Sequence, residues 1–241
     1  MASAAPARRL TAADVAVFVL GIVVGVGIFR APAEVAANTA SDAMFLALWG
    51  FGAVAALAGA LTYAELAARH PGIGGEYGFL RRAWGEPAGV LFVWARTAVI
   101  QTGSIAAVAF VLGDYAVRLV PGISPALVAG LAVLAFTLLN LLGVEMARRA
   151  QWILLSLVLV AVVGVMLAGS IADPLPRPEA TPSAAGSIGL ALVFVMLTFG
   201  GWNEAAYLSG ETRDGTRGFL RGLLGGILAI AFIYLGVNLA Y

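Results

Sequence analysis

The sequence predicts an all-α membrane protein with about seven transmembrane helices, the first and the sixth of them interrupted. Of the 241 residues, 61% are hydrophobic and only 11% are charged, less than half of the roughly 25% that is usual for soluble domains. The apolar residues gather in runs close to the ~20 residues that one membrane span needs, and glycine clusters break two of these runs. This composition excludes an ordinary soluble domain, and the high hydrophobicity with low net charge excludes a disordered chain.

Seven apolar runs are expected to cross the membrane one after another. The first and third are short, but each extends through one or two charges inside the span. A proline-rich segment, residues 173–182, separates the fifth run from the sixth and predicts an external loop, because proline forbids a continuous helix. The runs are residues 15–29, 43–64, 97–113, 119–144, 150–172, 180–203 and 222–241.

The arginines set the expected orientation through the positive-inside rule. Only Arg118 and Arg177 fall on one side and Arg30 and Arg96 fall within spans, whereas ten arginines fall on the other side. We therefore expect a cytoplasmic N-terminus and a first span that runs outward across the cytoplasmic (plasma) membrane. The ten are Arg8, Arg9, Arg69, Arg81, Arg82, Arg148, Arg149, Arg213, Arg217 and Arg221.

Glycines occupy the first run near the middle of the bilayer. Gly21, Gly25 and Gly27 each weaken a helix by roughly 1 kcal/mol relative to alanine, and Pro32 follows just beyond them. One alternative is that Gly21 and Gly25 form a face for close helix packing. Another is a cleaved signal peptide, since an arginine pair precedes the apolar stretch. The apolar segment continues through residues 30–34, which argues against cleavage.

The sixth run has the same character. Gly200 and Gly201 stand next to Trp202, Asn203 and Glu204, and bare backbone at this depth is tolerated only where it lines a cavity or is buried in protein. Two interrupted spans, five helices apart, are typical of secondary transporters built from inverted repeats. In that design the N-terminal ends of half-helices present N–H groups and a positive dipole to an anionic group of the substrate.

Three segments carry a family resemblance. They are Gly25-Val-Gly-Ile-Phe29 followed by Pro32, then Tyr63-Ala-Glu-Leu66 with Pro71-Gly-Ile-Gly-Gly-Glu-Tyr77 and Phe79-Leu-Arg-Arg82, and finally Gly200-Gly-Trp-Asn203 followed by Gly210-Glu211. With these segments in this order and spacing, the chain resembles the amino acid–polyamine–organocation (APC) superfamily. Within it, the chain is similar to the bacterial relatives of L-type amino acid transporters.

The resemblance implies a permease with a five-plus-five inverted repeat that works by alternating access. The substrate carboxylate is expected at N–H groups of the first break, and the substrate amino group at carbonyls of both breaks. A cytoplasmic tail (1–13) precedes the first repeat (14–172, helices one to five), an external loop (173–184) and the start of the second repeat (185–241, helices six and seven). The implied substrate-binding residues are Gly25, Val26, Gly27, Ile28, Phe199, Gly200, Gly201, Trp202 and Asn203.

The chain departs from the family pattern at several positions. Val26 stands where many relatives have serine, and Leu197 stands where many have an aromatic gate, two residues before Phe199. Val158 falls at about the position of a fifth-helix lysine, which disfavours lysine-mediated proton coupling and leaves the coupling ion, a proton or sodium, unassigned. The 241 residues contain no cysteine, so we expect no disulfide-linked heavy chain of the kind that animal L-type proteins use. Relatives usually have twelve spans, so the chain is expected to be a truncated permease that lacks helices eight to ten.

Polar side chains within the spans are candidates for a pocket or a gate. Arg96 lies about ten residues into the third span, hence roughly 15 Å deep, where an arginine normally faces a cavity or a partner. Glu204 is the expected partner, and Gln101 follows Arg96 on the same helix. A purely structural ion pair is the alternative for Arg96. Glu65 and Glu76, which stand among arginines, are expected to form loop salt bridges.

These observations favour a secondary active transporter of an amino acid or a related amine in the lipid bilayer. The alternative is a seven-helix receptor, or another membrane protein that binds small molecules without transport. An enzyme is disfavoured because the chain has no cysteine, one histidine (His70) and no acidic pair within a span. All 14 basic residues are arginine, which excludes a lysine Schiff base. We expect no cofactor and no metal site, and the net charge of +1 gives no reason to expect a nucleic acid partner.

Overall fold

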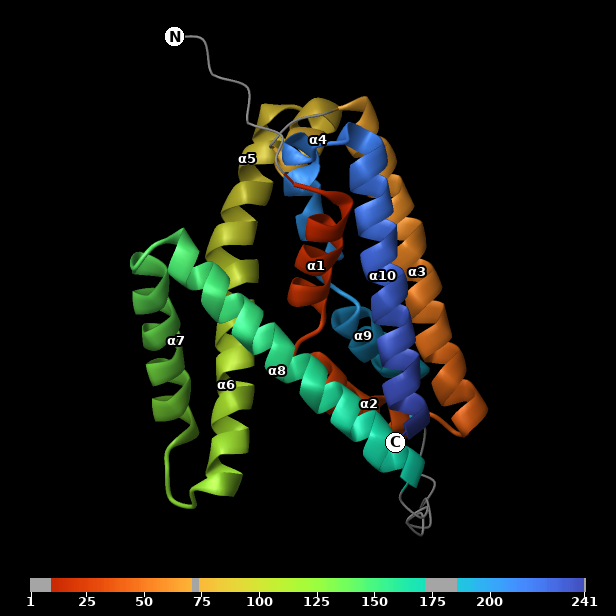
Figure 1. Cartoon of the computed structure of the whole chain (residues 1–241), viewed down its shortest axis with the longest axis vertical. Coiled ribbons are helices and arrows are strands. Elements are labelled where there is room, and N and C mark those ends of the chain that lie inside the picture. The colour runs from red at the N-terminus through yellow and green to blue at the C-terminus, as the bar shows by residue number, and fades with distance from the viewer. Residues whose placement is uncertain (1–9, 71–73, 172–185, 241) are drawn as a thin grey trace. The chain divides into compact units, whose positions relative to one another are not determined.

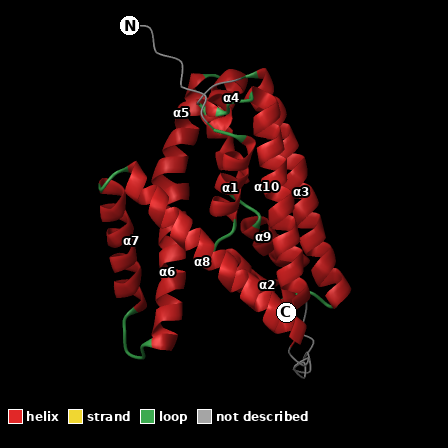
Figure 2. Cartoon of the chain, viewed as in Figure 1, coloured by secondary structure: helices red, strands yellow, loops and turns green. Residues whose placement is uncertain are grey.

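A computed structural model of the chain describes residues 10–70, 74–171 and 186–240. The elements in these ranges are helices, and the one extended pairing among them is an isolated parallel bridge between Leu10 and Thr212 (Figures 1 and 2). The predicted loop at 173–184, with Arg177, lies outside the described residues, as do most of the predicted tail and its Arg8 and Arg9.

The helices follow the predicted apolar runs in order. They are α1 (Ala12–Val23), α2 (Gly27–Ala37), α3 (Asp42–Arg69), α4 (Gly75–Trp84), α5 (Glu86–Ala95), the π-helix η1 (Arg96–Gln101), α6 (Thr102–Leu119), α7 (Pro125–Leu141), α8 (Val144–Ile171), α9 (Ile188–Thr198), the 3-10 helix η2 (Trp202–Glu211) and α10 (Gly215–Ala240).

Five helical stretches in the described ranges are long and apolar enough to cross a membrane, or six if α1 and α2 are one span bent by 55°. The fourth predicted run forms α7, which has only 17 residues. At 1.5 Å per residue its length is about 25 Å, less than the ~30 Å of a bilayer's hydrocarbon core. The described residues thus confirm the all-helical prediction, and their apolar stretches agree with a multi-pass membrane protein, whereas a seventh crossing stays a prediction.

The chain divides into two compact units, Met1–Glu76 with Leu157–Tyr241, and Tyr77–Ser156. In the first unit α10 lies beside α1 and α3 (Figure 1). Glycines allow this approach: a Cβ on Gly222 would lie 2.5 Å from the Ala12 carbonyl oxygen, and one on Gly226 would lie 3.0 Å from Val19 Cβ. Small residues at a helix interface let two backbones come close, and close packing is what associates helices in lipid.

The two ends of the first unit are each held by a contact between distant segments. At one end the Ser187 amide donates to Asn38 Oδ1 at 3.1 Å, which joins the start of α9 to the end of α2. At the other end Leu10 pairs with the segment before α10: its amide donates to the Glu211 carbonyl, and the Arg213 amide donates to the Leu10 carbonyl. A capping box between Thr11 and Asp14 starts α1 beside this pairing.

The second unit contains α5, η1, α6 and α7. α6 and α7 pack closely, because Gly113 has no side chain and lies directly against the Pro125 carbonyl group. Large apolar side chains along these helices are exposed, among them Leu119, Leu127 and Leu134. An apolar surface of this kind suits contact with lipid.

Candidate functional site

The first predicted break is present in the structure. α1 ends at Val23, the backbone of Val24 is extended (φ −77°, ψ 94°), and α2 begins at Gly27. A Cβ on Gly25 would meet nothing within 4 Å, so the alternative of a packing face does not hold for this glycine. The break therefore separates two helices at the place that the glycine cluster predicts.

The N-terminal end of α2 has no side-chain cap. Val26, at the N-cap, makes no side-chain hydrogen bond to the helix, and the first amides of a helix have no partner within the helix. Gly25, Val26 and Gly27 are half-buried residues, whereas Ile28 is fully buried. In general, the N-terminal end of a helix, with its positive dipole and its unpaired N–H groups, favours an anion.

The second break lies in the sixth run. α9 ends at Thr198, Gly201 takes a left-handed conformation (φ +103°), and the chain resumes as the 3-10 helix η2 at Trp202. Left-handed backbone is strained for any residue with a Cβ, and glycine avoids this strain. The sixth span is thus interrupted at the predicted Gly-Gly pair, but its second half is not an α-helix.

The two breaks lie against each other within the first unit. A Cβ on Gly201 would lie 2.8 Å from Ile22 Cγ2, and a Cβ on Gly27 would lie 3.4 Å from the Thr198 side chain. The end of α1 therefore contacts the second break, and the start of α2 contacts the end of α9. Two sets of helix-terminal backbone groups meet in one place.

Tyr234 of α10 joins the two breaks, a role that the sequence reasoning missed. Its hydroxyl lies 2.8 Å from the Val23 carbonyl oxygen and 3.1 Å from the Thr198 carbonyl oxygen, and it is fully buried. Its ring packs against Phe199 and Trp49, with centroids 5.0 and 5.9 Å apart. The one available signal was a tyrosine in the middle of the apolar seventh run.

The remaining predicted residues of the second break have distinct environments. Phe199 is buried, Gly200 is exposed and Glu204 is half-buried. Leu197, the predicted gate, has 71% of its surface exposed. Trp202 packs edge-on against Tyr63 of α3, with ring centroids 5.3 Å apart.

Glu76 differs from its expected role, whereas Glu65 forms the expected ion pair, but within helix α3 and not in a loop. Glu65 pairs with Arg69 at 2.6 Å on the exposed side of α3. Glu76 is in the first turn of α4 and is only 9% exposed, so the expected loop position is wrong. Its Oε1 accepts hydrogen bonds from the Tyr63 hydroxyl at 2.7 Å and from Asn203 Nδ2 at 2.9 Å. Residue spacing gave no sign of these partners, because Asn203 is 127 positions away in the chain.

Arg96 and Gln101 are in the second unit, at the two ends of the π-helix η1. Arg96 is half-buried, and its guanidinium lies over the Phe92 ring at 5.9 Å from the centroid, which is within the range of a cation–π interaction. Gln101 is exposed. Glu204 is in the first unit, so the Arg96–Glu204 ion pair stays a prediction.

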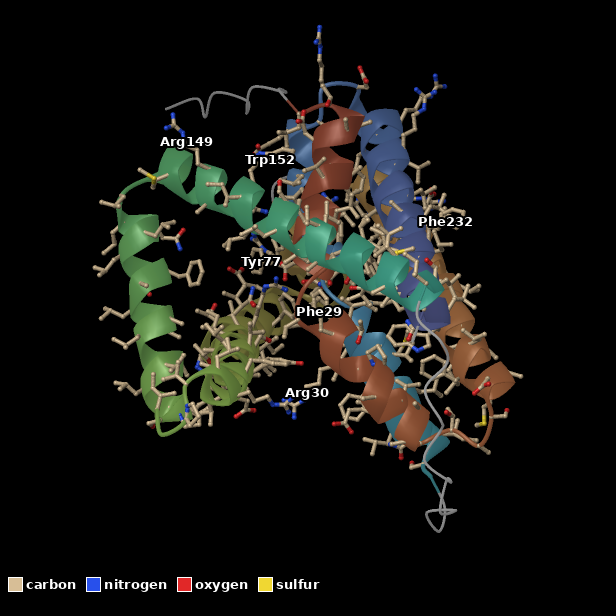
Figure 3. The ribbon with its side chains drawn as sticks, turned by 60° about the horizontal axis from the view of Figure 1, so that its bottom comes forward. Phe29, Arg30, Tyr77, Arg149, Trp152 and Phe232 are labelled. Carbon is tan, nitrogen blue, oxygen red and sulfur yellow. The ribbon has the colours of Figure 1, made fainter. Side chains whose placement is uncertain are left out.

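Two of the exposed side chains labelled in Figure 3 are Phe232 and Arg30. Figure 3 shows Phe232 of α10 directed away from the helix, and it is 76% exposed. Arg30 of α2 is also exposed. Among the described residues no group of three or more His, Cys, Asp or Glu side chains is placed to hold a metal ion.

Comparison with known proteins gives a family match over almost the whole chain. A family described as "Amino acid permease" matches residues 10–241. The b(0,+)-type amino acid transporter 1 of Mus musculus is 27% identical over 236 residues, which cover 92% of this chain and 48% of the relative. The large neutral amino acids transporter small subunit 2 of Rattus norvegicus is 31% identical over 239 residues, covering 92% and 45%. The chain thus spans about half the length of these curated relatives and corresponds to their N-terminal portion.

Proposed function

Because the chain belongs to the amino acid permease family of the APC superfamily, we propose that it acts as a secondary active transporter of an amino acid or a related amine. The observation that supports this most directly is the contact between two interrupted helices, whose terminal carbonyls share the buried Tyr234 hydroxyl. Relatives named as amino acid transporters support the substrate class.

The proposed site uses backbone groups of both breaks. The N–H groups of residues 25–28 bind the substrate carboxylate at the positive end of α2. Carbonyls of the first break and of residues 199–203 accept hydrogen bonds from the substrate ammonium group. Val26 has no hydroxyl, so the carboxylate relies on backbone donors alone.

The proposed cycle is alternating access, in which helices move around a fixed central site and no covalent bond changes. It assigns residues 14–172 to a first repeat and 185–241 to the start of a second, inverted one, with α7 as a short fourth crossing and the N-terminus in the cytoplasm. A proton or a sodium ion drives transport. No disulfide-linked heavy chain takes part.

Arg96, Gln101, Leu197 and Glu204 are proposed to line the pocket or the gate. Arg96 and Glu204 would form an ion pair, since a charge within a membrane is costly without a partner. A double-mutant cycle with Arg96→Ala and Glu204→Ala measures their coupling in substrate binding. Additive effects of the two substitutions would exclude the pair.

Counterflow tests the proposed function. Full-length protein in lipid vesicles loaded with an unlabelled amino acid is expected to accumulate the same labelled amino acid from outside, for at least one of the common amino acids. Val26→Trp, at the first break, should abolish this exchange. Val54→Trp is the matched control, because Val54 lies on α3 and is 65% exposed.

Binding of an amino acid without exchange across the vesicle membrane would contradict the proposed transport and favour a receptor. Retained exchange in Val26→Trp would place the site elsewhere. Thermal unfolding of both tryptophan variants checks that each is folded, so that a loss of exchange reports on the site.

A further inference from the structure

A set of four residues on α3 and α4 holds the second half of the sixth span. We call Gly59, Tyr63, Gly75 and Glu76 the η2 cradle. Tyr63 and the segment around Glu76 belong to a motif that marks the family resemblance, and the proposed substrate site gives that motif no role. In the structure all four residues contact η2.

Trp202 and Tyr207 of η2 fit against the glycines of the cradle. A Cβ on Gly59 would lie 2.5 Å from Trp202 Cη2 and Cζ2, and one on Gly75 would lie 2.5 Å from Tyr207 Cε1. Gly75 also has φ +46°, a conformation that residues with a side chain rarely adopt. Only glycine leaves room for the two aromatic rings at these positions.

Glu76 supplies a polar contact between the cradle and η2. Its Oε1 accepts both from Tyr63 and from Asn203. A buried carboxylate needs hydrogen bonds to offset its lost hydration, and bonds to an ionised acceptor are about twice as strong as neutral ones. The position of Oε1 therefore fixes the Asn203 side chain relative to α3.

We propose that Glu76 is a positioning residue for substrate binding: it holds Asn203, and with it the 3-10 half of the sixth span, in the place where the second break meets the first. This rests on the proposed function, in which residues 199–203 bind the substrate amino group. Glu76 acts through Asn203 and does not touch the substrate.

The affinity test compares three variants of the full-length protein. Glu76→Ala removes the acceptor and should raise the substrate Kd at least about tenfold, in line with the loss of a charged hydrogen bond. Glu76→Gln keeps an Oε1 acceptor and should stay within about threefold of the parent protein. Glu65→Ala is the matched control, because Glu65 is an exposed glutamate that pairs with Arg69 within α3. This substitution should leave the substrate Kd unchanged.

Equal effects of Glu76→Ala and Glu65→Ala would overturn the proposal. So would a Glu76→Gln loss as large as that of Glu76→Ala, because an acceptor at this position would then not be enough to hold Asn203 for binding. If the parent protein binds no amino acid, the proposed function fails. If the parent binds and only these comparisons fail, the function stands and the positioning role falls.

Thiol labelling gives a readout that a general loss of stability would not produce. The 241 residues contain no cysteine, so a single introduced thiol reports one position. Ala206 in η2 and Ala191 in α9 are both buried, at 1% and 0% exposure, and lie in the two halves of the same span. Glu76→Ala should speed labelling of Ala206→Cys at least about fivefold and leave Ala191→Cys unchanged, since only the η2 half loses its contact.

Equal changes at the two positions, or none, would overturn the proposal. If Glu76→Ala does not fold, Tyr63→Phe decides the question in its place. It removes one donor to Glu76 and keeps the ring beside Trp202, so Ala206→Cys should label faster by a smaller factor. No difference in that variant would also overturn the proposal.

Discussion

Tyr234 shows how one side chain can serve the ends of two interrupted helices. The last carbonyls of a helix have no partner within the helix, and a buried carbonyl without a partner is costly. The Tyr234 hydroxyl lies within hydrogen-bond distance of two such carbonyls, Val23 and Thr198. It therefore stabilises both breaks and fixes the distance between them.

Tyr234→Phe removes this hydroxyl and keeps the ring packed against Phe199. We expect a destabilisation of about 1–3 kcal/mol, because two buried carbonyls lose their donor. The midpoint of thermal unfolding in detergent measures it. Tyr115→Phe is the control, since Tyr115 is 40% exposed on α6 and should lose no more than about 0.5 kcal/mol. Equal shifts in both variants would mean that the hydroxyl contributes nothing at the breaks.

The structure requires glycine at one break more strictly than at the other. Gly201 has φ +103°, and a Cβ there would lie 2.8 Å from Ile22 Cγ2, whereas a Cβ on Gly25 would meet nothing within 4 Å. We expect Gly201→Ala to cost about 1–2 kcal/mol from its left-handed backbone alone, and Gly25→Ala to cost nothing. Chemical denaturation of the two variants compares them directly. A Gly25→Ala protein as unstable as Gly201→Ala would contradict this distinction.

At the scale of elements, α10 packs on α1 through one glycine face. A Cβ on Gly222 would lie 2.5 Å from the Ala12 carbonyl oxygen and one on Gly226 would lie 3.1 Å from that of Ala16, whereas Gly225 has open space. Gly222→Ala should therefore destabilise by about 1–3 kcal/mol through overpacking. Gly225→Ala should be neutral or stabilise by up to about 1 kcal/mol, since alanine favours a helix. Thermal unfolding separates the two, and a loss of stability in Gly225→Ala would contradict this account of the interface.

The sequence predicted the helices and their breaks better than it predicted the contacts between them. Both breaks could be predicted because glycine clusters act locally on helix stability, and the apolar runs marked every long helix. The 3-10 form of η2 and the π-helix η1 could not be predicted, since both depend on backbone detail that propensity does not record. The Glu76–Asn203 bond and the Tyr234 bridge join segments distant in the chain, so no local spacing indicated them.

At the scale of the whole molecule, the successive helices of the first unit run back and forth between two ends, as helices that cross a membrane would. The Asn38–Ser187 contact marks one end, where α2 finishes and α9 begins. The Leu10–Thr212 pairing marks the other, where α1 and α10 both begin. The arginine bias predicts that the second end is cytoplasmic, because Arg69 and Arg213 belong to it.

Single cysteines at the two ends test this orientation. Ala40, between α2 and α3, and Thr216, in the first turn of α10, are both exposed and uncharged, so neither substitution alters the arginine bias. A membrane-impermeant maleimide should label Ala40→Cys in intact cells, and Thr216→Cys only after the membrane is opened, because the positive-inside rule keeps the arginine-rich end in the cytoplasm. The parent protein serves as the background, and a permeant maleimide should label both variants. The reverse pattern would mean that the protein has the opposite orientation in the membrane. Labelling of both variants in intact cells would mean that the two positions do not lie on opposite sides of the bilayer.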